Sequence, residues 1–197
     1  MRKKSHVSLA LYLLESIDSE LLERHKKAFV MGSILPDCKP SFVTTRHNIE
    51  ETFELVMEYI DKLTENVDEF RRISTAYCRK LGEVTHYVAD YFTYPHNDIF
   101  EGNIKSHCIY EKELKFALKE YIESDDIVVN RNVVTTFNSA SDLCDYVKKM
   151  HRQYIDSEEK NIYSDCRYIV SLCYVVVAGV FYLLNKRLGG DFQVAMA

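Results

Sequence analysis

Glycine and proline are scarce in this chain, and their scarcity restricts the folds that it can form. Among its 197 residues there are six glycines and three prolines, together far below their average share of about 12%. Sandwiches and barrels of β-strands need a turn every ~8–12 residues, and this chain has too few turn residues to build them. Its glycines also form none of the runs that bind dinucleotides or nucleotide phosphates. We therefore predict an all-α fold, a single compact multi-helix domain over residues 1–190 with a tail at 191–197.

The net charge, the cysteines and the first residues limit the possible partners of the protein and its cellular compartment. A formal net charge of −5 argues against a specific nucleic-acid partner, because such binding depends on a basic surface. The six cysteines contain no C-x-x-C pair, so they indicate neither a zinc ribbon nor a thioredoxin motif. The first apolar stretch contains His6 and continues into Glu15 without a small-residue cleavage site, which favours an amphipathic helix over a signal peptide. We predict a cytoplasmic protein with reduced, mostly buried thiols.

The segment Tyr168–Leu184 is apolar over 17 residues and has two interpretations. Its length is at the lower limit for a membrane span, and a helix buried on all sides is equally hydrophobic all round. Since the preceding helices have apolar faces that need a partner, we predict a buried C-terminal helix. A membrane-associated protein is the alternative, and membrane contact is not predicted.

Helical spacing of apolar residues, N-caps and proline breaks divide the rest of the chain into helices. Residues 125–136 are the only β-like stretch, and we predict an extended loop there because no partner strand is near. The predicted helices cover approximately residues 5–23, 25–35, 45–63, 66–91, 103–124, 139–156 and 157–189.

Two histidines are followed four residues later by a carboxylate: His86 by Asp90, and His107 by Glu111. On a helix such residues lie on the same face, so each pair offers an imidazole and a carboxylate to one point, as a zinc site requires. An ordinary hydrogen-bonded helix pair has the same spacing. His96 adds a further donor directly after the break at Pro95.

Asp37 and His47 add two donors further upstream. Asp37 follows Pro36 at the end of a predicted helix, and His47 lies near the start of the next. A buried polar group among apolar neighbours needs a partner, and a metal cluster would satisfy several such groups together. The sequence places His25 on a charged helix end and His151 on a solvated face, and we expect neither to be a ligand.

These motifs resemble the zinc-dependent phospholipase C family. The resemblance rests on G-S-I-L-P-D at residues 32–37 with a histidine after it, on H-Y-x-x-D-x5-H over residues 86–96, on H-x3-E over residues 107–111, and on an early histidine in the first helix. It implies an all-α domain with zinc as cofactor. By position, one ion would be held by Asp37, His47, His86 and Asp90, a second by His96, His107 and Glu111, and a third by His6 with Asp90 as a bridge. In the family an N-terminal Trp completes the third site, but this chain has no Trp, so we expect two or three ions.

The sequence and the resemblance together predict a zinc-dependent, phospholipase C-like phosphodiester hydrolase that uses a metal-activated water, since zinc lowers the pKa of bound water to ~7. The resemblance suggests Asp37 as a ligand and general base, and Arg46 is a candidate for binding phosphate oxygens. The predicted substrate is a small-molecule or lipid phosphodiester. A metal phosphohydrolase of the HD type is disfavoured, because no histidine here is followed directly by aspartate. The alternative function is a non-catalytic helical protein that binds metal, a membrane or a partner.

Overall fold

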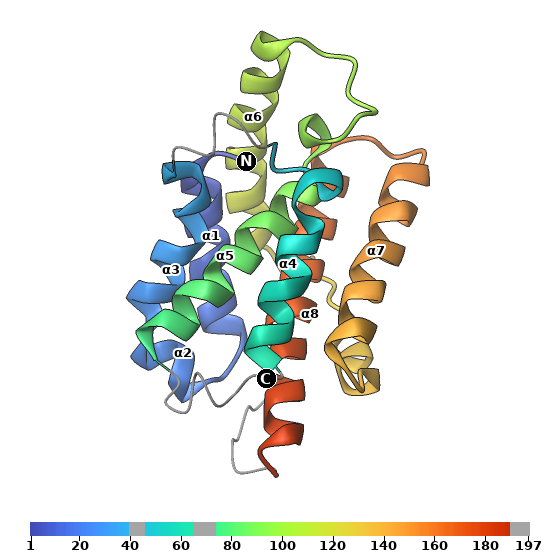
Figure 1. The fold of residues 1–197 in the computed structure, drawn as a ribbon. Coiled ribbons are helices and arrows are strands. Elements are labelled where there is room, and N and C mark those ends of the chain that lie inside the picture. Colours follow the sequence, from blue (N-terminus) through green and yellow to red (C-terminus); the bar gives the residue numbers. More distant parts are fainter. Residues whose placement is uncertain (40–45, 65–73, 190–197) are drawn as a thin grey trace.

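The computed structural model describes residues 1–39, 46–64 and 74–189, and every regular element in these ranges is helical (Figure 1). The α-helices are connected by short 3-10 helices, labelled η, and by loops. In chain order the elements are α1 (Lys3–Ser16), α2 (Glu20–Arg24), α3 (Lys26–Ile34), η1 (Pro36–Cys38), α4 (Ile49–Thr64), α5 (Thr75–Tyr91), η3 (Tyr94–His96), α6 (Ile104–Ile122), η4 (Arg131–Thr136), α7 (Ala140–Asp156) and α8 (Ile162–Arg187). The predicted all-α class is confirmed.

Several predicted boundaries need correction. The first predicted helix is two helices, because the Ser19 side chain accepts a hydrogen bond from Leu22 N and so caps α2 separately. The long central helix begins at Thr75 behind an N-cap at Ser74, and the expected cap at Asn66 lies outside the described residues. Residues 131–136 of the expected extended loop form η4. The predicted tail at 191–197 also lies outside the described residues.

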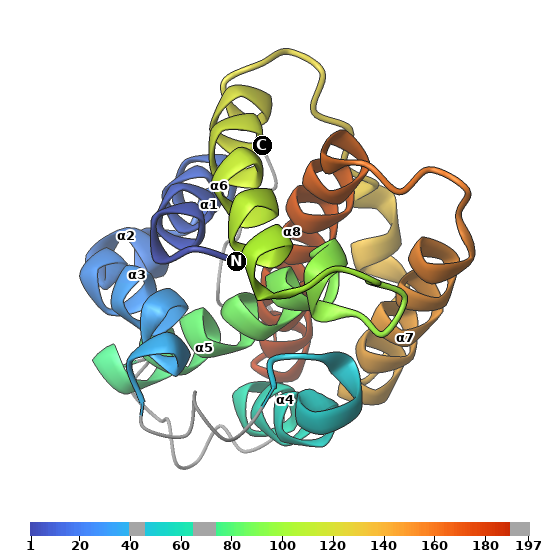
Figure 2. The ribbon, with the colours of Figure 1, turned by 90° about the horizontal axis from the view of Figure 1, so that it is seen from above.

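Helix α8 forms the centre of the core. It is the one helix in the described ranges that is long and apolar enough to cross a membrane, yet every residue of its apolar stretch is buried except Tyr168, Ser171 and Tyr182. Seen from above, α8 lies in the middle, with α1, α4, α5, α6 and α7 around it (Figure 2). The prediction of a buried C-terminal helix is confirmed. Four of the six cysteines are also buried, and all six are free.

Helices α3 and α5 cross so closely that their backbones touch. A Cβ atom added at Gly32 would lie 2.0 Å from the carbonyl oxygen of Arg79, and one added at Gly82 would lie 2.2 Å from that of Phe29. The crossing therefore requires glycine on both helices. It holds the end of α3, and η1 behind it, against the buried half of α5, in which every residue from Leu81 to Tyr91 is buried.

Candidate metal centre

His86 and Asp90 lie one turn apart in the fully buried half of α5. His86 Nδ1 is 2.8 Å from the carbonyl oxygen of Ser33 at the α3 crossing. Because a carbonyl can only accept, this nitrogen carries the proton, and in the neutral ring Nε2 has a lone pair. That lone pair faces carboxylate oxygens, since Nε2 lies 3.3 Å from Asp90 Oδ2 and 3.6 Å from Asp37 Oδ1.

Asp37 and His47 approach the same point from η1 and from the segment before α4. His47 Nδ1 lies 3.0 Å from His86 Nε2, 3.3 Å from Asp90 Oδ2 and 3.7 Å from Asp37 Oδ1. Asp37 and His47 are separated in sequence by residues 40–45, which lie outside the described ranges. Two imidazole nitrogens and two carboxylates thus converge within hydrogen-bond to ion-pair distance.

His6 extends this cluster from the first turn of α1. Its ring stacks on that of His86 with centroids 3.9 Å apart, and its Nε2 lies 3.4 Å from Asp90 Oδ1. Neither ring nitrogen of His6 has a hydrogen-bond partner among the described residues, although the ring is buried. A buried imidazole without a hydrogen bond is costly, so this ring would be stabilised by a cation that bound to one of its nitrogens.

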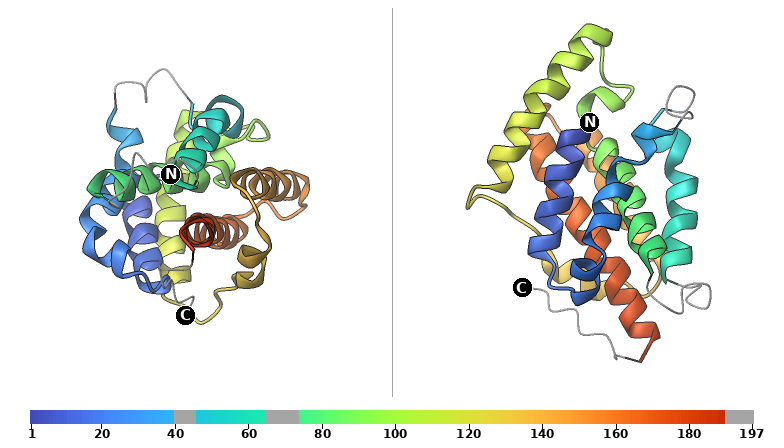
Figure 3. Two further views of the ribbon diagram at one scale, coloured as in Figure 1. Left: turned by 60° about the horizontal axis from the view of Figure 1, so that its bottom comes forward. Right: turned by 90° about the vertical axis from the view of Figure 1, so that its left-hand side faces the viewer.

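The α-amino group of Met1 lies between Asp90 and a second cluster of donors. It is 2.5 Å from Asp90 Oδ1, 3.3 Å from Glu111 Oε1 and 3.1 Å from His96 Nε2. Figure 3 shows the N-terminus at the start of α1, close to α6. This nitrogen is not among the predicted ligands. The signal for it was the position of His6 in the first turn of a helix, which brings the chain terminus within reach of the same site.

The second cluster consists of His96 on η3 with His107 and Glu111 on α6. Glu111 Oε1 lies 3.4 Å from His96 Nε2 and 3.3 Å from His107 Nε2. His96 Nδ1 lies 3.4 Å from the carbonyl oxygen of His47, which directs Nε2 of that ring toward Glu111. These three side chains are less buried than those around His86.

Burial and charge set the protonation of these groups. Burial, and then the charge of His86, lower the pKa of His6 to about 3. Burial and the Met1 ammonium also lower the pKa of His96. Burial alone would raise the pKa of Asp90, but the Met1 ammonium and the surrounding histidines hold it well below its usual range. Because a metal ion binds a neutral imidazole and an ionised carboxylate, the directions of the pKa shifts at His6, His96 and Asp90 favour metal binding.

Glu111, Asp37 and the Met1 amine differ in the direction of their pKa shifts. Burial opposes ionisation of Glu111, but hydrogen bonds from His107 and His96 outweigh it and lower the pKa. Burial raises the pKa of Asp37. Burial lowers the pKa of the Met1 amine, but the carboxylates of Asp90 and Glu111 more than compensate, so this pKa is raised.

The residues fit zinc. Nitrogen and carboxylate oxygen donors without thiolate are typical of catalytic zinc sites. Three groups of donors have their ligand atoms within 4.8 Å of one another: His6 with Asp37 and His86, His47 with His86 and Asp90, and His96 with His107 and Glu111. A cation between the lone pair of His86 and the carboxylates would also give the unpartnered ring of His6 something to bind.

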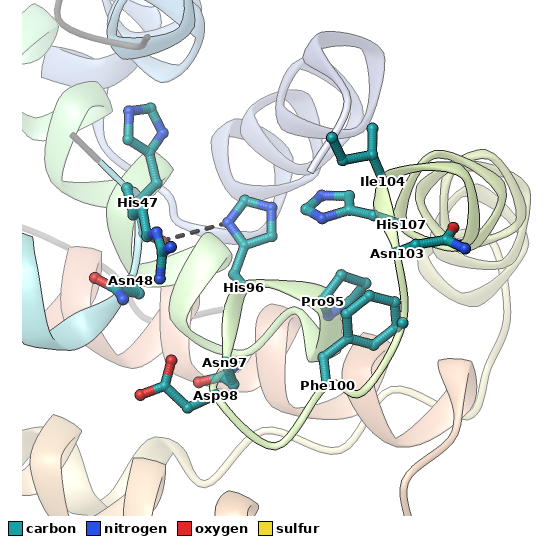
Figure 4. Close-up of a pocket in the computed structure, with 12 residues that line it drawn as sticks. His47, Asn48, Pro95, His96, Asn97, Asp98, Phe100, Asn103, Ile104 and His107 are labelled. Atoms are coloured by element: carbon teal, nitrogen blue, oxygen red, sulfur yellow. Dashed lines mark hydrogen bonds between the residues drawn. The ribbon is translucent and has the colours of Figure 1, made fainter. Parts of the chain in front are cut away.

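A pocket of about 470 Å³ opens beside both clusters and is bordered by His47, His96 and His107. Figure 4 shows the rings of His96 and His107 next to each other on its wall, with the hydrogen bond from His96 to His47 dashed. Arg46 also lines the pocket, and its side chain is 78% exposed. The pocket thus joins a cationic side chain to the donor atoms of both clusters.

The structure brings all eight predicted ligands into these two adjoining clusters. The two histidines expected to be bystanders lie elsewhere. His25 lies at the junction of α2 and α3. The prediction that His151 lies on a solvated face is wrong. This residue is buried, and its Nε2 lies 2.8 Å from Asn97 Oδ1. It lies on the buried face of α7, together with Val147 and Tyr154.

Comparison with known families gives one match. A family model described as zinc dependent phospholipase C matches residues 5–161, which include all eight predicted ligands and end directly before α8. Neither the curated proteins nor the solved structures contain a significant match.

Proposed function

This chain belongs to the zinc-dependent phospholipase C family, and we propose that it is a zinc-dependent hydrolase of a lipid or small-molecule phosphodiester. The observation that carries this proposal is the pocket, because it is bordered by donors of both clusters and by Arg46. A tetrahedral phosphodiester in this pocket would contact both clusters at once.

The eight side chains would hold two or three zinc ions. Asp37, His47, His86 and Asp90 would hold one ion, and His96, His107 and Glu111 a second. His6, with Asp90 and the α-amino group of Met1, offers donors for a third. When bound, zinc lowers the pKa of water and stabilises negative charge on phosphoryl oxygens.

The other steps belong to the side chains. Arg46 would donate charge-assisted hydrogen bonds to the phosphoryl oxygens and so orient the phosphorus. Asp37 would accept the proton of the attacking water on a carboxylate oxygen. The new bond would form between the water oxygen and phosphorus, the bond to the leaving alcohol oxygen would break, and that oxygen would take up the proton that Asp37 accepted.

The proposal is tested by measuring zinc content and phosphodiester hydrolysis on the full chain. We expect at least two zinc ions per chain, and hydrolysis of a chromogenic phosphodiester that a chelator abolishes and zinc restores. His86→Ala should lose zinc and reduce kcat/KM by more than about 100-fold, since altering even the partners of a ligand costs 10–100-fold. Arg46→Ala should keep its zinc and raise KM by about 10-fold, the value of one charge-assisted hydrogen bond.

His25→Ala is the matched control, because it removes a histidine outside both clusters and should leave zinc content and turnover unchanged. A short-chain phospholipid compared with a soluble diester then distinguishes lipid from small-molecule substrates. Zinc binding without turnover on either substrate would contradict the hydrolase and favour a non-catalytic metal-binding protein. A wild-type chain without bound zinc would contradict the proposal altogether.

A further inference from the structure

Asp165 is a fully buried carboxylate outside both clusters, in the first turn of α8. Three donors bind it. Its Oδ2 accepts hydrogen bonds from the backbone N–H of Tyr94, at 2.8 Å, and from the hydroxyl of Tyr110, at 2.9 Å. Its Oδ1 accepts one from the hydroxyl of Tyr154, at 2.7 Å.

The two carboxylate oxygens face different parts of the molecule. Tyr94 begins η3, which carries His96 two residues later, and Tyr110 lies on α6 directly before Glu111. Oδ2 therefore binds both elements that supply the second cluster. Tyr154 lies on α7, which contributes none of the candidate ligands.

The cluster needs such a link because packing alone does not fix α6 at its ligands. The buried residues of this helix are Leu114, Leu118 and Tyr121, all of them after Glu111. Residues 104–113, which carry both ligands of α6, contain no buried side chain. Tyr110 is half-buried in this stretch, and its hydroxyl connects it to the rigid core helix α8.

We propose that Asp165 is a positioning residue for zinc, fixing η3 and α6 relative to each other so that His96, His107 and Glu111 bind one ion. The inference rests on the proposed function, since it takes this cluster to hold zinc. Ligands of one ion must be held to within about 0.5 Å. The shared carboxylate oxygen supplies that constraint between two elements that the chain connects only through residues 97–103.

Two matched variants test the proposal, because each removes a single hydroxyl donor to the same carboxylate. Tyr110→Phe breaks the link to the ligand helix, and Tyr154→Phe breaks only the link to α7. We expect Tyr110→Phe to weaken the binding of one zinc ion by about 10-fold or more, while Tyr154→Phe leaves every zinc affinity unchanged. Asp165→Ala should also weaken the binding of this ion, because it removes the oxygen that accepts both bonds.

The affinities are measured by competition with a chromophoric chelator, which resolves the ions that each variant releases first. Thermal unfolding in excess chelator shows whether the two Tyr→Phe variants lose similar stability without metal. If Asp165 had a purely structural role, equal losses of stability would be accompanied by equal zinc affinities. The absorption spectrum of the Co²⁺-loaded protein adds an independent readout, and it should change in Tyr110→Phe but not in Tyr154→Phe.

Equal zinc affinities in the two Tyr→Phe variants, whether both reduced or both unchanged, would overturn the positioning role. In that case a wild-type chain that binds zinc and hydrolyses the diester would leave the proposed function intact. If the wild-type chain binds no zinc, the proposed function fails and this inference fails with it.

Discussion

A single hydrogen bond outside the metal centre determines what His86 presents to it. The Ser33 carbonyl fixes the proton on Nδ1, so the lone pair of Nε2 faces the carboxylates of Asp37 and Asp90 and Nδ1 of His47. His6 stacks on the same ring without a hydrogen-bond partner of its own. Both rings are thereby arranged as acceptors for a cation.

His151 shows the opposite arrangement, because its ring is buried in a neutral, hydrogen-bonded position. Burial lowers its pKa to about 4, against ~6.5 in an unfolded chain. Between these two pKa values the unfolded chain binds more protons than the folded one, so the free energy of unfolding rises with pH. The contribution of this ring to stability is lost as the pH falls from the unfolded pKa to the folded one. The pKa shift of His151 changes the free energy of unfolding by at most about 3 kcal/mol.

We therefore expect His151→Gln to flatten the pH dependence of stability between pH 6.5 and pH 4. Glutamine cannot take up a proton there, and it can still donate to Asn97. The measurement is urea unfolding of the chelator-treated protein at several pH values in this window, with His25→Gln as the control for loss of any histidine. If the free energy of unfolding of His151→Gln had the same slope with pH as that of the wild type, the His151 ring would not contribute to the pH dependence of stability.

At the scale of elements, the crossing of α3 and α5 couples packing to the metal centre. The glycine contacts bring Ser33 against His86, and the chain then continues through Pro36 to Asp37. The glycine of the G-S-I-L-P-D motif thus has a structural reason, because a side chain at Gly32 would separate the two helices that bear these groups.

Gly82→Ala should destabilise the protein although alanine favours helices by ~1 kcal/mol over glycine. Its Cβ would meet the backbone of Phe29 at 2.2 Å and that of Ser33 at 2.8 Å, and backbone cannot yield as a side chain does. We expect a loss of about 2 kcal/mol or more, measured by thermal unfolding, together with weaker zinc binding because Ser33 moves away from His86.

Gly179→Ala on α8 is the matched control. Its added Cβ would meet the side chain of Leu143 at 3.2 Å, which can shift, so its stability should change by less than about 1 kcal/mol and its zinc affinity should not change. If both alanine variants were equally stable, the close backbone contact at Gly82 would not determine how α3 and α5 cross.

At the scale of the whole molecule, the sequence was informative where one element acts alone. The four-residue spacing in α5 and the continuous apolar stretch of α8 depend only on local periodicity, and both predictions match the structure. The separate cap of α2 was missed because Ser19 is one of several serines with no distinctive neighbour. The bonds from Asp165 to Tyr94 and Tyr110 join residues 71 and 55 positions apart, and no local pattern encodes them.

The donors of the centre also come from across the chain: from α1, η1, the segment before α4, α5, η3 and α6. Without a cation the carboxylate of Asp37 and the ring of His6 are largely buried with incomplete compensation, which is costly. We therefore expect zinc to stabilise the entire fold rather than one loop. A free zinc concentration 1,000 times the Kd contributes about 4 kcal/mol, and for a chain of this size ~1 kcal/mol shifts Tm by about 2–4 °C.

Chelator treatment should accordingly lower Tm by about 8–16 °C, and added zinc should restore it. His86→Ala is the decisive comparison, because it removes a shared donor of two of the three ligand groups and should show a much smaller gain on zinc addition. A wild-type Tm that is the same with and without zinc would mean that the donors are held in place by packing alone. The ring of His6 argues against that outcome, since it is buried and neither of its nitrogens makes a hydrogen bond among the described residues.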